Sequence, residues 1–145
     1  MSLFSTLSVS ASGMAAQRTR AELLVQNMAN SETTRTPEGG PYRRKDVVFE
    51  AEPQQSAFAA IFQNELNAGS QGVQVAGIVE DTRDPIKRYM PGHPDADKDG
   101  YVAFPNVNPA EDMVDLMDAS RSYEGNIAAM SAIKDMLSKS IDLMR

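Results

Sequence analysis

The fold is decided by residues 109–145, which read PAEDMVDLMDASRSYEGNIAAMSAIKDMLSKSIDLMR. Asn108 is a typical N-cap residue, Pro109 suits the first helical position, and Glu111 is the acid that a capping box requires. Residues that suit a helix interface then recur at alternating steps of three and four, which keeps one stripe of a helix facing a partner helix. The stripe comprises Met113, Leu116, Ser120, Tyr123, Ile127, Met130, Lys134, Leu137, Ile141 and Met144. The segment therefore predicts one long helix.

A second row follows the same spacing about 100° further around this helix, because each residue advances the helix by about 100°. Its members are Ala129, Ile133, Met136, Ser140 and Leu143. One antiparallel partner from the same chain can bury only one of the two faces. Exposed apolar stripes of this length are interaction sites or aggregation liabilities. We therefore expect the helix to pack against other molecules.

The N-terminal segment, about residues 2–31, repeats the pattern and predicts a second long helix. Its stripe comprises Leu3, Leu7, Ser10, Met14, Gln17, Ala21, Leu24, Met28 and Ser31. Gly13 costs about 1 kcal/mol of helix propensity relative to Ala. The small side chains around it let the backbone approach another helix closely. The two ends together predict a mainly α fold whose long N- and C-terminal heptad helices pack as a coiled-coil-like bundle.

The middle of the chain, residues 32–108, predicts a small, irregular segment that contains β-structure. Residues 36–41 read TPEGGP and predict a turn, since Pro fixes φ and Gly frees it. Short strands are predicted at residues 47–49, 73–78, 86–90 and 101–104. Phe58, Ile61, Phe62 and Leu66 stand at helical spacing, but this run is short and its structure stays open. We therefore divide the chain into an N-terminal assembly helix (residues 1–31), a linker with an outward β-containing segment (32–108) and a C-terminal assembly helix (109–145).

Composition narrows the possible functions. The chain has no cysteine, which excludes disulfides, thiolate metal sites and cysteine nucleophiles. The net charge is -6, and the acidic excess lies after residue 50, so nucleic acid is an unfavourable partner. The single basic run, residues 43–45, is expected to be a solvated loop. No apolar stretch approaches the roughly 20 residues that span a bilayer, and the N-terminus lacks the basic leader and apolar core of a signal peptide.

One acidic loop resembles half of a calcium site. Asp95, Asp97 and Asp99 stand at positions one, three and five of a calcium loop, with Gly100 at position six. Position twelve is Asn106, which cannot supply the bidentate carboxylate that usually sets the affinity. A polar turn is the favoured interpretation, and a calcium-binding adaptor is the alternative.

Catalysis has little support. His93 is the only histidine and lies between Gly92 and Pro94. A histidine base needs a nucleophile and an orienting acid, and the sequence offers no nucleophile motif. A hydrolase that uses His93 is the most remote alternative. We expect no enzyme activity, no cofactor and no metal.

Several separate segments resemble bacterial flagellar rod and hook proteins. They are residues 27–30 (NMAN), 33–45 (TTRTPEGGPYRRK), 93–97 (HPDAD), 100–102 (GYV), 105–108 (PNVN) and 121–126 (RSYEGN). On these motifs the chain resembles the flagellar basal-body rod protein family. The motif residues are Asn27, Ala29, Asn30, Gly39, Gly40, Tyr42, Arg121, Tyr123 and Asn126. Asn27 and Asn30 are expected to form side-chain bonds that end the first helix, unless they are simply solvated.

The resemblance implies a structural subunit of the proximal basal-body rod that transmits torque and forms part of an export channel wall. It implies a periplasmic location, reached by type III export without a cleaved signal peptide. The implied partners are other copies of the chain, other rod proteins, and components of the flagellar ring and export apparatus. The expected assembly interface comprises Leu3, Leu7, Met14, Ala21, Leu24, Met28, Met113, Leu116, Tyr123, Ile127, Met130, Ile133, Met136, Leu137, Ile141 and Met144.

Overall fold

The computed structural model describes residues 3–52 and 71–143, apart from the side chain of Leu3. The elements are α1 (Leu3–Ala29), β1 (Lys45–Ala51), β2 (Val73–Glu80), β3 (Ile86–Tyr89), β4 (Tyr101–Phe104) and α3 (Pro109–Asp142). Two helices with a small antiparallel β region between them confirm the mainly α fold. The four short strands are confirmed too, while the open prediction for Phe58 to Leu66 falls outside the described residues.

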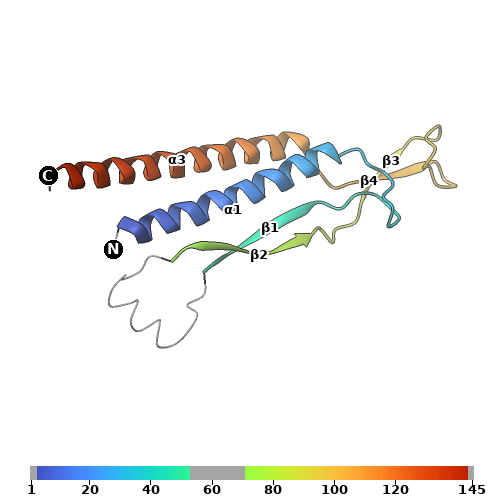
Figure 1. Ribbon diagram of the computed structural model, residues 1–145. Helices are drawn as coiled ribbons and strands as arrows, with labels where there is room; N and C mark the ends of the chain where they lie inside the picture. Colours follow the sequence, from blue (N-terminus) through green and yellow to red (C-terminus); the bar gives the residue numbers. More distant parts are fainter. Residues whose placement is uncertain (1–2, 53–70, 144–145) are drawn as a thin grey trace, which may run out of the picture.

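The molecule is elongated (Figure 1). α1 lies between α3 on one side and the β1–β2 ribbon on the other, and the β3–β4 hairpin extends beyond the end where α3 begins. The 34 residues of α3 give a length of about 51 Å and the 27 residues of α1 about 40 Å, at about 1.5 Å per residue. α3 therefore extends past the N-terminal end of α1.

α3 begins where the sequence predicts it. Asn108 has extended backbone angles, and its side-chain Oδ1 accepts a hydrogen bond from the backbone N of Ala110 at 3.2 Å. Pro109 follows it, Glu111 and Asp112 lie in the first turn, and Lys139 lies in the last turn. These charges complement the helix dipole, which favours acids at the N-terminus and bases at the C-terminus.

The two helices are antiparallel and approach closely at Gly13. A Cβ built on Gly13 would stand 3.3 Å from Nδ2 of Asn126, which is tighter than ordinary van der Waals contact. Further along the pair, Arg20 reaches Asp115. The close approach confirms what the small side chains around Gly13 predict.

The face that α3 turns toward α1 consists of two columns, each with residues seven apart. Asp112, Ala119 and Ile133 are buried in the first column, which also contains Asn126. The second column is Leu116, Tyr123, Met130 and Leu137, of which all but Tyr123 are half-buried.

The stripe that the spacing singled out contains only the second of these columns. Its other column, Met113, Ser120, Ile127, Lys134 and Ile141, lies exposed on the opposite flank. Alternating steps of three and four residues result whether the Leu116 column is combined with the column on one side of it or with the column on the other side. The small side chain of Ala119 and the contact of Asn126 with Gly13 make the observed flank the one that admits α1 closely.

The strands form two separate antiparallel pairs. In the first, Lys45 pairs with Glu80, and a bulge interrupts the register between Val48 and Phe49. In the second, Ile86 pairs with Phe104, and the register runs to the turn that joins β3 and β4. The first pair is held to α1 where Ser12 Oγ accepts a hydrogen bond from the N–H of Val73 at 3.1 Å.

Candidate assembly site

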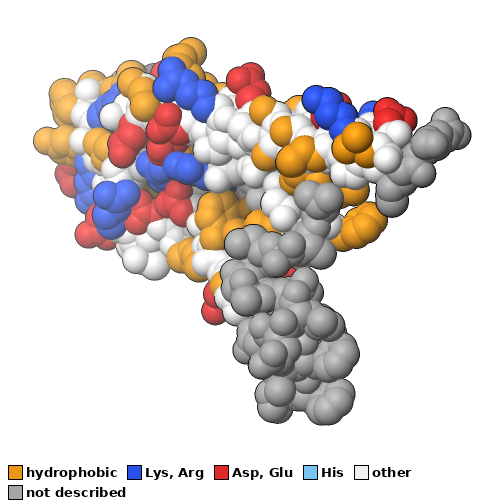
Figure 2. Space-filling model, turned by 90° about the vertical axis from the view of Figure 1, so that its left-hand side faces the viewer, with side chains coloured by type: hydrophobic (Ala, Val, Ile, Leu, Met, Phe, Trp, Pro, Cys, Tyr) orange, Lys and Arg blue, Asp and Glu red, His pale blue; other side chains and the backbone are white. Residues whose placement is uncertain are grey.

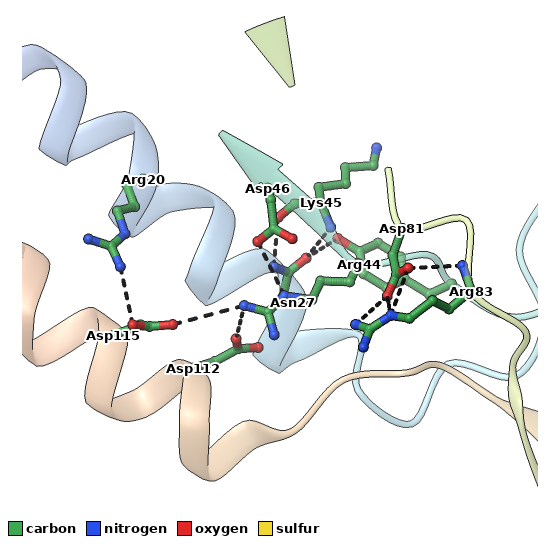
Figure 3. A network of polar contacts seen from close by, with 10 residues as sticks. Arg20, Asn27, Arg44, Lys45, Asp46, Asp81, Arg83, Asp112 and Asp115 are labelled. Atoms are coloured by element: carbon green, nitrogen blue, oxygen red, sulfur yellow. Dashed lines mark hydrogen bonds and ion pairs between the residues drawn. The ribbon is translucent and has the colours of Figure 1, made fainter. Parts of the chain in front are cut away.

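Two features of the described residues stand out as functional candidates. One is a polar cluster where α1, the start of β1 and the start of α3 meet, which we call the junction (Asn27, Tyr42, Arg44 and Asp112). The other is a set of apolar side chains that both helices leave exposed. Figure 3 shows Asn27, Arg44 and Asp112 of the junction.

Asn27 is completely buried near the end of α1 and ties that helix to β1. Its Nδ2 donates to the backbone O of Lys45, and its Oδ1 accepts from the backbone N of Lys45, both at 2.9 Å. The hydroxyl of Tyr42 also donates to Oδ1 at 2.9 Å. The side-chain amide therefore bonds to the strand as a neighbouring peptide group would. The expectation that Asn27 ends its own helix is wrong.

Asn30 does act locally, as expected. Its Nδ2 donates to the backbone O of Gln26 at 2.9 Å, and its Oδ1 accepts from the hydroxyl of Thr33 at 3.2 Å. The Gln26 carbonyl, in the last turn of α1, thus accepts from the side chain of Asn30 as well as from its backbone N. These bonds also fix the first residues of the chain that leads to Tyr42.

Tyr42 is placed by a turn that needs glycine. Gly39 and Gly40 have φ of +92° and +82°, and the backbone N of Thr36 donates to the O of Gly40 at 2.8 Å. Residues other than glycine rarely adopt such φ angles. Burial raises the pKa of Tyr42, and the negative charges of Glu80 and Asp112 raise it further, so the hydroxyl stays protonated as a donor to Asn27.

Arg44 connects this turn to α3. Its Nη2 lies 3.1 Å from Oδ1 of Asp112 and 3.9 Å from Oδ2 of Asp115, and its Nε lies 3.2 Å from Oδ1 of Asp46. Arg20 of α1 joins the same group, with its Nη2 3.1 Å from Oδ1 of Asp115. Charges from α1, β1 and α3 are thus paired within one cluster (Figure 3).

The Arg44–Asp112 pair is buried. The side chain of Arg44 is 14% exposed and that of Asp112 is 0% exposed. Burial raises the pKa of the Asp112 carboxyl, and Arg44 acts in the opposite direction. Burial lowers the pKa of Arg44, but the carboxylates of Asp112 and Asp46 outweigh it and the pKa is raised overall. The expectation that residues 43–45 form a solvated loop is therefore wrong for Arg44.

The exposed apolar side chains line a groove between α1 and α3. A hollow between the helices is lined by Gln17, Arg18, Ala21, Ala119, Ser120, Tyr123 and Glu124. From Arg18 and Ser120 in its lining, two columns of exposed residues seven apart run along the helices. They are Phe4, Ala11, Arg18 and Val25 of α1, and Met113, Ser120, Ile127, Lys134 and Ile141 of α3. We call this feature the groove; Val25, Met113 and Ile127 on its walls are 52%, 52% and 47% exposed.

The structure distributes the expected interface residues over three environments. Leu24 and Ile133 are buried, and Leu7, Met14, Ala21, Met28, Leu116, Met130 and Leu137 are half-buried. Met113, Tyr123, Ile127, Met136 and Ile141 are exposed. The side chain of Leu3 and the whole of Met144 lie outside the described residues. Figure 2, which views the molecule from the end where both termini lie, shows hydrophobic side chains reaching the surface beside charged ones.

The remaining family-motif residues are spread over both helices and the turn before Tyr42. Asn126 contacts Gly13 and donates from Nδ2 to the backbone O of Ser122 at 3.0 Å. Ala29, Gly39, Gly40 and Arg121 are exposed, as is Tyr123 on the groove. The motif residues thus lie at both the junction and the helix pair, and three of them, Gly39, Gly40 and Tyr42, line one hollow together with Arg44 and Asp81.

The acidic loop has the contacts of a polar turn. Asp97 Oδ1 accepts from the backbone N of Asp99 at 3.0 Å and of Tyr101 at 2.9 Å. Asp95 accepts from the hydroxyl of Thr34 at 2.8 Å, and Nδ1 of His93 accepts from the backbone N of Asp95 at 3.1 Å. Across the described residues, no three acidic or histidine side chains come together in a way that could hold a metal ion.

Comparison with known proteins identifies the relatives of this chain. A family model described as the flagellar basal body rod FlgEFG protein C-terminal matches residues 98–143. The whole chain is 40% identical over 152 aligned residues to the flagellar basal-body rod protein FlgC of Borreliella burgdorferi, with 100% of this chain and 99% of the relative covered. FlgC of Bacillus subtilis is 42% identical and FlgC of Salmonella typhimurium 37%; each alignment covers 99% of this chain, and 99% and 98% of the relative. In the part of the chain that the structure describes, neither helix combines the length and hydropathy needed to cross a membrane.

Proposed function

The chain belongs to the FlgC family of flagellar basal-body rod proteins and is a structural subunit of the rod, and from this we propose that α1 and α3 are its assembly elements. In this proposal the helix pairs of neighbouring subunits pack as a coiled-coil-like bundle, and residues 32–108 face outward from it. The family is one of structural components and not a class of enzymes.

One observation carries the proposal: on the same side of the pair, both helices leave columns exposed that contain several large apolar side chains. Val25, Met113 and Ile127 are about half exposed although the helices already bury each other along a different face. Exposed apolar area favours association, because burying it stabilises a complex by roughly 25 cal/mol per Å². Because the family consists of rod proteins, neighbouring rod subunits are the partners that we propose for these columns.

The same proposal gives the finer role of the molecule. The rod that such bundles build would be the proximal rod, with ring and export components beside it in the periplasm. Its wall would surround the export channel, and torque would pass between subunits through the packed helices. The subunit itself would arrive by type III export without a cleaved signal peptide.

A charge placed in the groove tests the proposal. We expect Ile127→Glu to abolish swimming and rod assembly, because a buried carboxylate without a partner costs several kcal/mol. Ile127 is half exposed in the single chain, so the variant should keep its helix content by circular dichroism. Ala128→Glu adds the same charge one residue later, on the side of α3 that faces away from α1, and should swim. Normal swimming of the Ile127 variant, or equal loss in both variants, would refute the proposal.

A further inference from the structure

The β3–β4 hairpin has one face turned inward and one exposed face. Phe104 is buried on the first, where Cζ of Arg88 lies 4.9 Å from the centroid of its ring. Tyr89 pairs directly with Tyr101 in the register, so both lie on the other face, as does Lys87 two residues before Tyr89. Tyr89 is 65% exposed and Tyr101 is 44% exposed. We call Lys87, Tyr89 and Tyr101 the hairpin face.

The two tyrosines of the hairpin face are held in place although they are exposed. Their ring centroids are 5.4 Å apart and their planes meet at 64°, an edge-to-face arrangement. A Cβ built on Gly100 would stand only 2.9 Å from Cε2 of Tyr89, so this ring lies directly against the backbone of the turn. Aromatic side chains are enriched at protein interfaces, and groups that are already ordered lose less entropy on binding. The hairpin face therefore has the properties of a contact surface.

The chemistry of the hairpin indicates what it would contact. Among the described helices and strands, β3 and β4 contact only each other, and the hairpin extends beyond the end where α3 begins (Figure 1). The two strands carry the cations Lys87 and Arg88 and no acid. In the turn that joins them, Asp95 lies 3.8 Å from Arg35, and Asp97 accepts backbone N–H groups of the turn itself. A partner for the hairpin face should therefore combine apolar side chains with negative charge.

Such a surface lies near the beginning of α3, on the side that faces away from α1. It consists of Glu111, Val114, Met117, Asp118 and Arg121, and we call it the outer face. Val114 and Arg121 each follow a buried, α1-facing residue by two positions, which is about 200° around the helix. Val114 is 59% exposed and Met117 is 51% exposed, while the charges on this face are two acids and one cation. α1 is the one described element that α3 contacts, so no other described element covers the outer face.

We propose that the hairpin face of one copy packs on the outer face of α3 in a second copy. The tyrosine pair covers Val114 and Met117, and Lys87 meets Asp118. The lengths agree, since β3 and the stretch from Val114 to Arg121 each extend about 10 Å. This inference rests on the proposed function, in which copies of the chain assemble, and it adds a contact outside the groove.

The contact suits a rod because its two surfaces are unlike. A surface that meets its own copy gives a two-fold symmetric contact that closes as a dimer, whereas a contact between unlike surfaces repeats from copy to copy. Charge favours the unlike pairing too: two hairpin faces would bring cations together, and a hairpin face on an outer face brings cations to acids. Because the hairpin extends beyond the beginning of α3, the second copy is shifted along the long axis of the molecule. A repeated shift of this kind builds length.

Cysteine cross-linking tests the contact without interference, because the chain contains no cysteine of its own. Tyr89→Cys places a thiol on the hairpin face and Met117→Cys places one on the outer face. The two variants are produced together in cells that lack the natural copy, and isolated basal bodies are oxidised with copper phenanthroline. We expect a disulfide-linked dimer from the mixture and none from either variant alone.

Tyr89→Cys mixed with Asp135→Cys is the matched control. Asp135 is exposed and points in the same direction as Met117, but it stands five turns, or about 27 Å, further along α3. This mixture should give at least tenfold less dimer. If Tyr89→Cys does not support swimming, Lys87→Cys replaces it on the same face and must give the same dimer with Met117→Cys.

Each other outcome overturns the contact. A dimer from Tyr89→Cys alone would show two hairpins facing each other, and as much dimer with Asp135→Cys would show encounters without a defined contact. No dimer from the mixture would also overturn it, and benzophenone maleimide attached to Tyr89→Cys would then link the hairpin to its actual neighbour, identified by mass.

The groove variant separates this inference from the proposed function. If no dimer forms and Ile127→Glu still blocks assembly, the helices remain the assembly elements and only the hairpin contact fails. If Ile127→Glu assembles normally, the proposed role of the groove fails, whatever the hairpin contacts.

Discussion

Arg44, directly before β1, places its Nη2 3.1 Å from Oδ1 of Asp112, a carboxylate that is fully buried in the first turn of α3. In the described part of the chain, Arg44 is the one cation within ion-pair distance of Asp112. The pair fixes the start of α3 against the segment that leads into β1. The stability of the fold should therefore be sensitive to substitution of either Arg44 or Asp112.

Arg44→Met should destabilise the purified chain by about 3 to 5 kcal/mol, because it leaves a buried carboxylate without its cation. Urea unfolding followed by circular dichroism measures the change. Arg18→Met is the matched control, because Arg18 pairs with Glu22 on an exposed helix surface, where solvent screens the pair and its loss should change stability far less. An equal loss in both variants would show that the buried pair has no special role.

The pH dependence of stability should report Asp112. Its pKa in the folded chain is raised above the ordinary value of 3.8 by burial, so the folded state binds this proton more tightly than the unfolded state. The resulting stabilisation is present below pH 3.8 and is lost as the pH rises through the folded pKa. The unfolding free energy of the natural chain minus that of Asp112→Asn should therefore fall as the pH rises from about 3 and then level off. Asp118→Asn, at an exposed carboxylate, should give a difference that changes much less; a flat curve for Asp112→Asn would contradict the prediction.

The two helix glycines should respond differently to alanine. Nothing lies within 4 Å of a Cβ at Gly125, so Gly125→Ala should raise the unfolding free energy by up to about 1 kcal/mol through helix propensity alone. At Gly13 the same gain is offset by the contact with Asn126, so Gly13→Ala should gain less. Gly13→Leu should lose stability because the helices must separate. Thermal melts of the three variants rank these effects, and a gain from Gly13→Leu would mean that the helices do not meet there.

Asn27 should tolerate no substitution that removes its donor. Asn27→Asp keeps the shape but cannot donate to the O of Lys45 and buries a charge, so we expect a loss of about 2 kcal/mol or more. Tyr42→Phe removes a single hydrogen bond to the same side chain and should cost about 1 kcal/mol. Urea unfolding of both variants and of their combination gives the coupling between them. Fully additive losses would show that the two side chains act independently.

The sequence predicts the elements of this fold better than their mutual placement. The start of α3 was predictable because Asn108, Pro109 and Glu111 act within a few residues of one another. The flank of α3 that meets α1 was not predictable, since steps of three and four do not decide which of the two columns beside the Leu116 column faces α1. The role of Asn27 was missed for a related reason: its partners, Tyr42 and Lys45, follow a turn whose geometry no short-range pattern specifies. Arg44 was missed because its partner Asp112 lies more than sixty residues away.

The position of α1 between two later segments has a consequence for folding. Arg20 and its partner Asp115 are 95 residues apart, and Ser12 and its partner Val73 are 61 residues apart. Contacts with such large sequence separation require loop closure before they stabilise anything, and proteins dominated by them fold slowly. Because β2 and α3 follow α1 in the chain, α1 gains its full set of neighbours only after both have been synthesised. The topology therefore favours slow folding, and the chain stays unfolded and extended for a long period before its long-range contacts form.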